Sequence, residues 1–229
     1  GGAIHYYGFF GNSSPRIFNT FFSGNTAFRG GAIFNYVVSD DNRPSLINCV
    51  LSGNLAEQGG CIYNWGFQGV CRLTMINCVV SGNNSISSPL AVFYNEAIMG
   101  GGCEVQLTNS IVWNNSATFF NSSATVTADY CMIQVAGGYS GTNNKPDGTN
   151  PLFINAPGFN SAPTADGNFR LLPNSPAIDM GLNAANTYPT DVYGNSRIWI
   201  DSIDIGAYEF EGPECSLFVS GIVYVDSSA

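Results

Sequence analysis

The segment Ile17-Phe-Asn-Thr-Phe-Phe-Ser-Gly-Asn25 returns as Leu46-Ile-Asn-Cys-Val-Leu-Ser-Gly-Asn54 and as Met75-Ile-Asn-Cys-Val-Val-Ser-Gly-Asn83. A weaker fourth copy is Leu107-Thr-Asn-Ser-Ile-Val-Trp-Asn-Asn115, and the copies are 29, 29 and 32 residues apart. A fixed period of roughly 20–50 residues is typical of solenoids, in which each repeat contacts mainly its neighbours. The repeat therefore predicts a solenoid for the first half of the chain.

A second motif with the same step, Gly-Gly-Ala-Ile or Gly-Gly-Cys-Ile, begins at Gly1, Gly30 and Gly59. Between these motifs lie short β-branched and apolar runs, interrupted by Ser-Gly-Asn, which predict strands separated by turns. No run keeps the apolar period of a helix. Strands stacked at a fixed step without crossover helices predict an all-β fold, a right-handed parallel β-helix, with the hand taken from the usual hand of parallel crossovers.

Asparagines recur at matching positions of the repeats, and we expect their amides to stack as structural ladders rather than to bind a ligand. The first set is Asn19, Asn48, Asn77 and Asn109, the second is Asn25, Asn54, Asn83 and Asn115, and the third is Asn35, Asn64 and Asn95. Apolar residues do not simply alternate along the repeat, because Leu46 and Ile47 are adjacent. A bend near Asn48 would account for this pattern.

Charge divides the chain into two chemically different regions. The net charge is −9, but residues 1–144 hold six acids and four bases, whereas residues 145–229 hold ten acids and three bases. We predict β-helix repeats over 1–144, an acidic, loop-rich region over 145–212 that caps or continues the last coils, and a strand-like tail over 213–229. Nucleic-acid binding is disfavoured because no basic stripe neutralises phosphate. No apolar run is long enough to span a membrane.

Seven cysteines leave at least one thiol without a partner in the same chain. Cys49 and Cys78 occupy the same repeat position, and we expect them to stack as small buried apolar groups. Cys61 and Cys71 flank a loop-like segment and form a candidate disulfide. A zinc site is disfavoured, because the chain has one histidine and no Cys-x-x-Cys motif.

Both ends of the chain suggest contacts with further polypeptide. Gly1 falls at the repeat position of Gly30 and Gly59, so the first coil would begin without a cap, and an open strand edge invites pairing. We expect either a fragment of a longer protein or end-to-end stacking into a filament. The tail would then cap the last coil or add a strand to a neighbour. The residues predicted for self-association are Gly1, Leu217, Phe218, Val219, Ile222, Val223, Tyr224 and Val225.

The repeats, with Gly-Gly-Ala-Ile and Phe22-Ser-Gly-Asn25, resemble those of polymorphic outer-membrane-protein-type adhesins. An ordered C-terminal series is more specific and is similar to bacterial surface proteins with a choice-of-anchor Q domain. Its segments are 126–134, 137–142, Asn150-Pro-Leu-Phe153, 168–179, 190–197 and Asp204-Ile-Gly-Ala-Tyr-Glu-Phe210. The resemblance covers roughly residues 1–212. It implies an exported right-handed β-helix, held at the cell surface or released, with no established catalytic residues.

We assign no catalytic residue and no cofactor. A glycoside hydrolase needs two converging carboxylates and a calcium site needs several, whereas Glu57, Glu96 and Glu104 do not match in repeat position. We interpret Asp40-Asp41 as a solvated turn, and a general-base role for the single histidine, His5, is remote. The acids that could converge are C-terminal. Calcium candidates, as alternatives to turn and cap roles, are Asp179, Asp191, Asp201 and Asp204, with Glu209 nearby in sequence.

Aromatic residues are numerous, with 16 Phe, 11 Tyr and 3 Trp, and cluster around Trp65-Gly-Phe67 and Tyr6-Tyr7-Gly-Phe-Phe10. They either cover the coil corners or form an exposed stripe that binds sugar rings or a partner protein. We therefore expect a non-enzymatic, extracellular structural or adhesin-like protein of a bacterial surface, with a glycan or surface protein as partner. The alternative is a carbohydrate-active β-helix that binds or cleaves polysaccharide.

Overall fold

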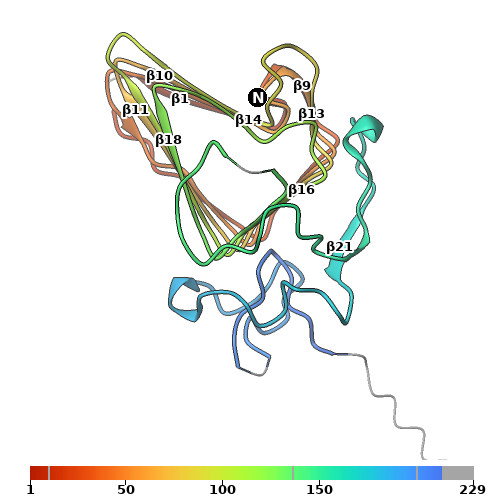
Figure 1. Cartoon of the computed structure of the whole chain (residues 1–229). Coiled ribbons are helices and arrows are strands. Elements are labelled where there is room, and N and C mark those ends of the chain that lie inside the picture. Colours follow the sequence, from red (N-terminus) through yellow and green to blue (C-terminus); the bar gives the residue numbers. More distant parts are fainter. Residues whose placement is uncertain (10, 136, 200, 213–229) are drawn as a thin grey trace, which may run out of the picture.

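The structure is a computed structural model that describes residues 1–9, 11–135, 137–199 and 201–212. The tail predicted for 213–229, with the self-association residues Leu217 to Val225, lies outside these ranges. The described chain forms a β-solenoid of about four turns built from parallel sheets, which confirms the all-β fold. In Figure 1, the chain circulates anticlockwise while later coils lie nearer the viewer, so the β-helix is right-handed.

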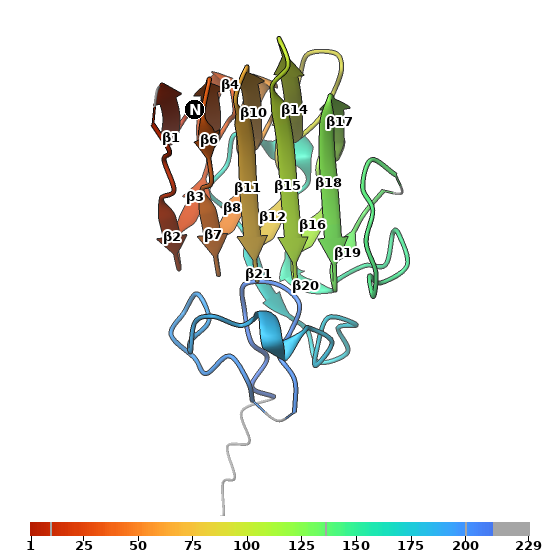
Figure 2. The ribbon, with the colours of Figure 1, turned by 90° about the vertical axis from the view of Figure 1, so that its left-hand side faces the viewer.

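Successive coils add strands to four parallel sheets, A to D, which form the faces of the solenoid, and the strands within a sheet lie side by side along its length (Figure 2). Sheet A contains β1 (Ile4–Phe9), β5 (Ile33–Val38), β10 (Ile62–Phe67), β14 (Phe93–Ile98) and β17 (Phe119–Ser122). Sheet B contains β2 (Arg16–Phe18), β6 (Asp41–Asn42), β7 (Ser45–Ile47), β11 (Val70–Ile76), β15 (Gly102–Thr108) and β18 (Ala124–Asp129).

Sheet C contains β3 (Phe21–Ser23), β8 (Val50–Ser52), β12 (Val79–Ser81), β16 (Ile111–Trp113) and β19 (Met132–Ile133). Sheet D contains β4 (Thr26–Arg29), β9 (Leu55–Gln58) and β13 (Asn84–Ser85). The C-terminal region has one antiparallel pair, β20 (Phe153–Asn155) with β21 (Asn168–Leu171), and two 3-10 helices, η1 (Phe159–Ser161) and η2 (Asn183–Ala185). In the described ranges, no helix has the length and apolarity needed to cross a membrane.

The repeated glycines and asparagines form the corners between sheets. Gly30 and Gly59, at the turn from sheet D to sheet A, have φ angles of +63° and +65°. A Cβ atom on Gly30 would lie 2.0 Å from the carbonyl oxygen of Ile33, so the turn requires glycine. Asn48 and Asn77 join sheet B to sheet C with φ angles of +52° and +53°, a conformation that asparagine tolerates. The predicted bend at Asn48 is therefore confirmed.

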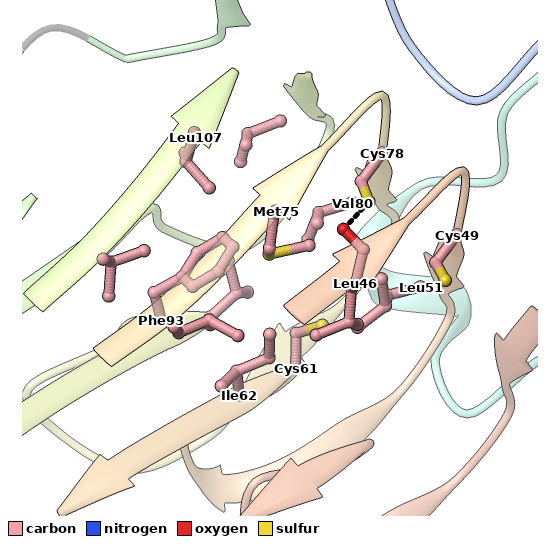
Figure 3. Packing of buried hydrophobic residues seen from close by; sticks show 14 of the residues in the cluster. Leu46, Cys49, Leu51, Cys61, Ile62, Met75, Cys78, Val80, Phe93 and Leu107 are labelled. Atoms are coloured by element: carbon pink, nitrogen blue, oxygen red, sulfur yellow. Dashed lines mark hydrogen bonds between the residues drawn. The ribbon is translucent and has the colours of Figure 1, made fainter. Parts of the chain in front are cut away.

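The interior is a stack of equivalent apolar side chains. Leu46, Met75 and Leu107 lie in register on β7, β11 and β15, and all three are buried. They belong to one core cluster with Ile62 and Phe93 of sheet A, as Figure 3 shows. Stacking thus gives each coil the same inward layer, and burial of these side chains supplies the main favourable free energy of folding.

The second asparagine set forms a continuous hydrogen-bonded ladder inside the solenoid. The Nδ2 atoms of Asn25, Asn54 and Asn83 each donate to Oδ1 of the next member, at 2.9, 2.8 and 3.0 Å, ending at Asn115. The backbone N–H groups of Asn25, Asn54 and Asn83 donate to the same oxygens, at 3.0, 2.9 and 2.9 Å. Each Oδ1 therefore accepts two hydrogen bonds, which fixes both the spacing and the register of neighbouring coils.

The third set stacks in the same way and extends further than predicted. Nδ2 donates to Oδ1 from Asn35 to Asn64 at 3.2 Å and from Asn64 to Asn95 at 2.7 Å. The ladder continues from Asn95 to Asn121 at 2.9 Å. Asn121 then donates to the carbonyl oxygen of Gly138 at 2.6 Å. A buried row of amides thus lines sheet A with its polar groups satisfied by the neighbouring coil.

The first set differs, because its side chains reach the C-terminal region. The Nδ2 atom of Asn48 donates to the carbonyl oxygen of Thr190 at 2.7 Å. Asn109 donates to the carbonyl oxygen of Leu182 at 3.1 Å and accepts from the Leu182 N–H at 2.8 Å. Within the set, Asn109 also donates to Asn77 at 3.0 Å. These asparagines therefore fasten the C-terminal region to the corner between sheets B and C.

The C-terminal region lies along the side of the solenoid rather than across its end (Figures 1 and 2). Val50, Val79, Ile111 and Met132, the outward residues of successive sheet C strands, form a second apolar cluster with residues of the region. Its C-terminal members are Phe153, Phe169, Leu171, Ala177, Val192, Ile205, Ala207 and Tyr208. The region predicted as a cap thus covers the outer face of sheet C.

The end of the last coil is covered by a shorter segment, residues 138–148. Ser140 bridges Thr127 in parallel register, and its N–H donates to the carbonyl oxygen of Val126 at 2.9 Å. The side chain of Asn144 accepts from the Cys131 N–H at 2.8 Å and donates to the Ala128 carbonyl at 2.7 Å. Part of the open edge of β18 and β19 is therefore occupied by the chain itself.

The predicted disulfide between Cys61 and Cys71 is wrong, because the extended chain between the two residues holds their thiols far apart. The segment between them is not a loop but strand β10 followed by the corner into β11. Six residues of extended strand cover roughly 20 Å, whereas a disulfide requires Cα atoms within roughly 7 Å. Cys61 lies in the main core, and Cys71 lies in a separate small cluster with Val37 and Ala97.

Replacement of a central ladder asparagine should destabilise the fold more than replacement of a terminal one. Asn83→Ala removes the acceptor of two hydrogen bonds and buries their donors unsatisfied, so we expect a loss of about 3 kcal/mol in unfolding free energy. Asn25→Ala is the matched control at the half-exposed end of the ladder, with an expected loss of about 1 kcal/mol. Urea unfolding measures both, and equal losses would contradict a ladder that sets the coil register.

Candidate functional site

The outward side chains of sheet A form an aromatic surface, here called the aromatic face. The strand register places them in two rows that run across the coils. The first row is His5, Phe34, Tyr63, Tyr94 and Phe120, and the second row is Tyr7, Tyr36 and Trp65, followed by Glu96. The sequence therefore predicted the stacking of these rings, whose spacing follows from the repeat, but the rows are not exposed throughout, because Tyr63 and Tyr94 are buried.

Neighbouring rings of the aromatic face overlap. His5 stacks on Phe34 with centroids 4.8 Å apart, and Tyr36 stacks on Trp65 at the same distance. The planes of the two rings differ by 6° in the first pair and by 25° in the second, so each ring packs face to face against the ring of the next coil. His5 and Tyr7 of the first coil are exposed, whereas Tyr63 and Tyr94 of later coils are buried. The accessible part of the face is therefore at the first coils.

Polar groups border the aromatic face. The Arg29 guanidinium lies 4.9 Å from the ring centre of Trp65 and 5.2 Å from that of Tyr63, and its Nε donates to Gln58 at 3.3 Å. The Tyr63 hydroxyl donates to Oε2 of Glu96 at 2.5 Å. Burial, together with this hydrogen bond, raises the pKa of Tyr63. The face thus combines ring surface with a cation, a carboxylate and an amide, groups that bind hydroxyls and other polar atoms.

A charged groove lies on the adjacent sheet B. It has a volume of about 320 Å³, and its lining includes Arg43, Arg72, Glu104 and Gln106. Asp41 accepts from Arg43 at 2.8 Å and from Arg72 at 3.2 Å, and Arg72 also pairs with Glu104. The hydrogen bonds to Glu104 and Asp41 raise the pKa of Arg72. Two acids and two bases therefore neutralise one another in this groove.

This network corrects the interpretation of Asp41 as a solvated turn residue. Asp41 begins the short strand β6, which pairs with β11, so its carboxylate faces the next coil. The sequence contained a signal for it, because Arg43 and Arg72 are one repeat of 29 residues apart. The register then places Glu104 opposite Arg72. The arginine step, rather than the acids, was therefore the sequence signal of this network.

The C-terminal acids converge only in part. Asp191, Asp204 and Glu209 are buried together with Arg197, whereas Asp179 and Asp201 are exposed. Nη2 of Arg197 donates to the carbonyl oxygens of Asp204 and Gly206, at 3.0 and 3.1 Å. The two motifs of the C-terminal series, residues 190–197 and Asp204-Ile-Gly-Ala-Tyr-Glu-Phe210, thus meet around one buried arginine.

Backbone N–H groups occupy the oxygens of these buried carboxylates. Asp191 accepts from the N–H groups of Tyr193, Asn195 and Glu209, at 2.8, 2.9 and 3.1 Å. Asp204 accepts from Asp179 and Phe210, at 2.8 and 2.7 Å. In the described ranges, no three His, Cys, Asp or Glu side chains are grouped to hold a metal ion. Calcium at the predicted residues would have to displace these N–H donors.

Comparison of the chain with protein-family models, curated proteins and solved structures found no match in any of the three. The resemblance to choice-of-anchor Q proteins and to polymorphic outer-membrane-protein-type repeats therefore stays a prediction. Arguments about function rest on the geometry of the aromatic face, the charged groove and the buried acid cluster.

The acid cluster predicts a stability that falls as pH rises. Burial raises the pKa of Asp204 to about 6 and that of Glu209 to about 8, above the values of roughly 4 expected in the unfolded chain. The folded state therefore holds these protons more tightly, and the contribution is complete below pH 4 and lost as pH passes 6 and 8. Glu209→Gln should flatten the upper part of this slope. Urea unfolding from pH 4 to 9 tests this, and an unchanged slope in the variant would contradict it.

Proposed function

We propose that this protein is a non-enzymatic, extracellular, adhesin-like β-helix that binds a surface glycan with its aromatic face. The observation that carries the proposal is the pair of ring rows on sheet A, bordered by Arg29, Gln58 and Glu96. Glycans present both apolar ring faces and hydroxyl groups. The aromatic face offers a partner for each, without requiring a deep pocket.

The chemistry of the aromatic face favours binding over catalysis. Its rings are held by stacking on neighbouring coils, so little side-chain entropy remains to be lost when a ligand docks. Its carboxylate, Glu96, is hydrogen-bonded to Tyr63 rather than opposed by a second acid. Glycoside hydrolysis uses two carboxylates across the scissile bond. The location outside the cell or at its surface rests on the sequence resemblance alone and is part of the proposal.

The charged groove supports a second candidate, a carbohydrate-active β-helix. The groove brings Asp41 and Glu104 to one surface and places two arginines between them, which is the kind of cluster that an enzyme of this fold would need. Against this role, each carboxylate is already paired with an arginine. A catalytic acid or base would have to leave its ion pair to reach a substrate.

The sequence also predicted end-to-end assembly through the solenoid ends. Residues 138–148 already pair with the last coil, so strand addition at this end would have to displace them. The proposed tail contact involves residues outside the described ranges. We therefore place ligand binding by the aromatic face, rather than filament formation, at the centre of the proposed function.

Substitutions on the aromatic face should weaken glycan binding without unfolding the protein. Tyr7→Ser and Tyr36→Ser remove accessible rings near the first coils, and we expect the affinity to fall at least about tenfold for the double variant. Binding to a panel of purified polysaccharides coupled to beads measures the affinity. The control is Thr125→Ala, an exposed position on the outer face of sheet B that does not line the charged groove.

The same incubations separate the two candidate functions. We expect retention of the protein with no change in polysaccharide chain length. Shortened chains, together with loss of that activity in Glu104→Gln, would overturn the non-enzymatic proposal in favour of the charged groove. Equal binding by the double variant and the wild type would show that the aromatic face is not the binding surface.

A further inference from the structure

Two pairs of cysteines lie on adjacent coils at matching positions. Cys71 of β11 and Cys103 of β15 are direct register partners in sheet B, so their side chains point to the same side. Both belong to one small buried cluster with Val37 and Ala97. The neighbours are small, which leaves the two thiols as the main reactive groups of the cluster.

Cys49 and Cys78 form the second pair, at the corner between sheets B and C. Ile47 pairs with Ile76 and Val50 pairs with Val79, so the two cysteines between them are aligned. Each thiol donates to carbonyl oxygens of its own and the preceding coil, as Cys78 does to Leu46 at 3.4 Å (Figure 3). The two sulfurs interact, and the hydrogen bond from Cys78 lowers the pKa of Cys49.

We propose that Cys49–Cys78 and Cys71–Cys103 are disulfide sites that covalently join consecutive coils when the protein folds in an oxidising compartment. Neighbouring parallel strands are roughly 4.8 Å apart, which lies within the Cα separation that a disulfide spans. Closure requires the Cβ atoms to approach by roughly 1 Å, a small shift for side chains on the same face. The expectation of an oxidising compartment depends on the proposed extracellular function, whereas the choice of cysteine partners depends only on the strand register.

The chemistry is thiol–disulfide exchange with a small-molecule or protein disulfide as the oxidant. A first thiol attacks the oxidant, forms a mixed disulfide and releases one reduced thiol. The thiolate of the partner cysteine then attacks the protein sulfur of that mixed disulfide, breaks the bond to the oxidant and releases the second reduced thiol. Two electrons and two protons pass to the oxidant for each protein disulfide formed.

The remaining described cysteines lack a stacked thiol. Cys61 lies between Ala32 and Val92 on the adjacent coils, and Cys131 neighbours Ser110. These two residues therefore provide internal controls, since the proposal predicts that they stay reduced.

The test is refolding of the full chain in a buffer of oxidised and reduced glutathione, followed by alkylation of free thiols and peptide mapping. We expect two disulfide-linked peptide pairs, Cys49 with Cys78 and Cys71 with Cys103. Before alkylation, the mass of the refolded chain should be lower than that of the fully reduced chain by the four hydrogens that two disulfides release. Cys71→Ser should abolish one pair and leave the other. Cys61→Ser, the control, should leave both.

Free thiols at all four positions, or a different pairing, would overturn the proposal. A variant that fails to fold does not decide the matter by itself, so the wild-type peptide map is the primary readout. This outcome is independent of the proposed function, because glycan binding is measured on the aromatic face and does not require either disulfide.

Discussion

The in-register stacking of identical side chains on neighbouring coils is the constraint on which this structure depends. In the ladder from Asn25 to Asn115, one amide oxygen accepts both a side-chain and a backbone N–H from the preceding coil. A shift of one residue would break these bonds and also exchange the inward and outward faces. The ladder therefore fixes the register, and the register determines which side chains reach each surface.

Because every coil repeats the same path, each outer face acquires a single character. Sheet A carries the aromatic rows, sheet B carries the charged groove, and sheet C is covered by the C-terminal region. The same stacking aligns the cysteine pairs. The faces thus differ in chemistry although they come from one repeat.

The sequence was sufficient to predict the local and periodic features. The 29-residue step predicted the solenoid, and Asn48 marked the bend between sheets B and C. Contacts between distant segments were not predictable, because no period connects them: Asn48 meets Thr190 across 142 residues. The disulfide prediction failed because Cys61 and Cys71 are near in sequence but are separated by the whole length of β10 and the corner into β11. The Arg43–Arg72 step was visible, but its role became evident only once the register placed Asp41 and Glu104 beside it.

Hydrogen exchange at the backbone N–H groups of Asn54 and Asn83 tests the central role of the ladder most directly. These groups donate to the side-chain oxygens of the next coil at 2.9 Å in both cases. If the ladder holds the register, they should exchange only through global unfolding, with the same free energy as core strand amides such as that of Leu73. Exchange as fast as that of exposed loops in the C-terminal region would show that the coils separate locally, and would contradict the account.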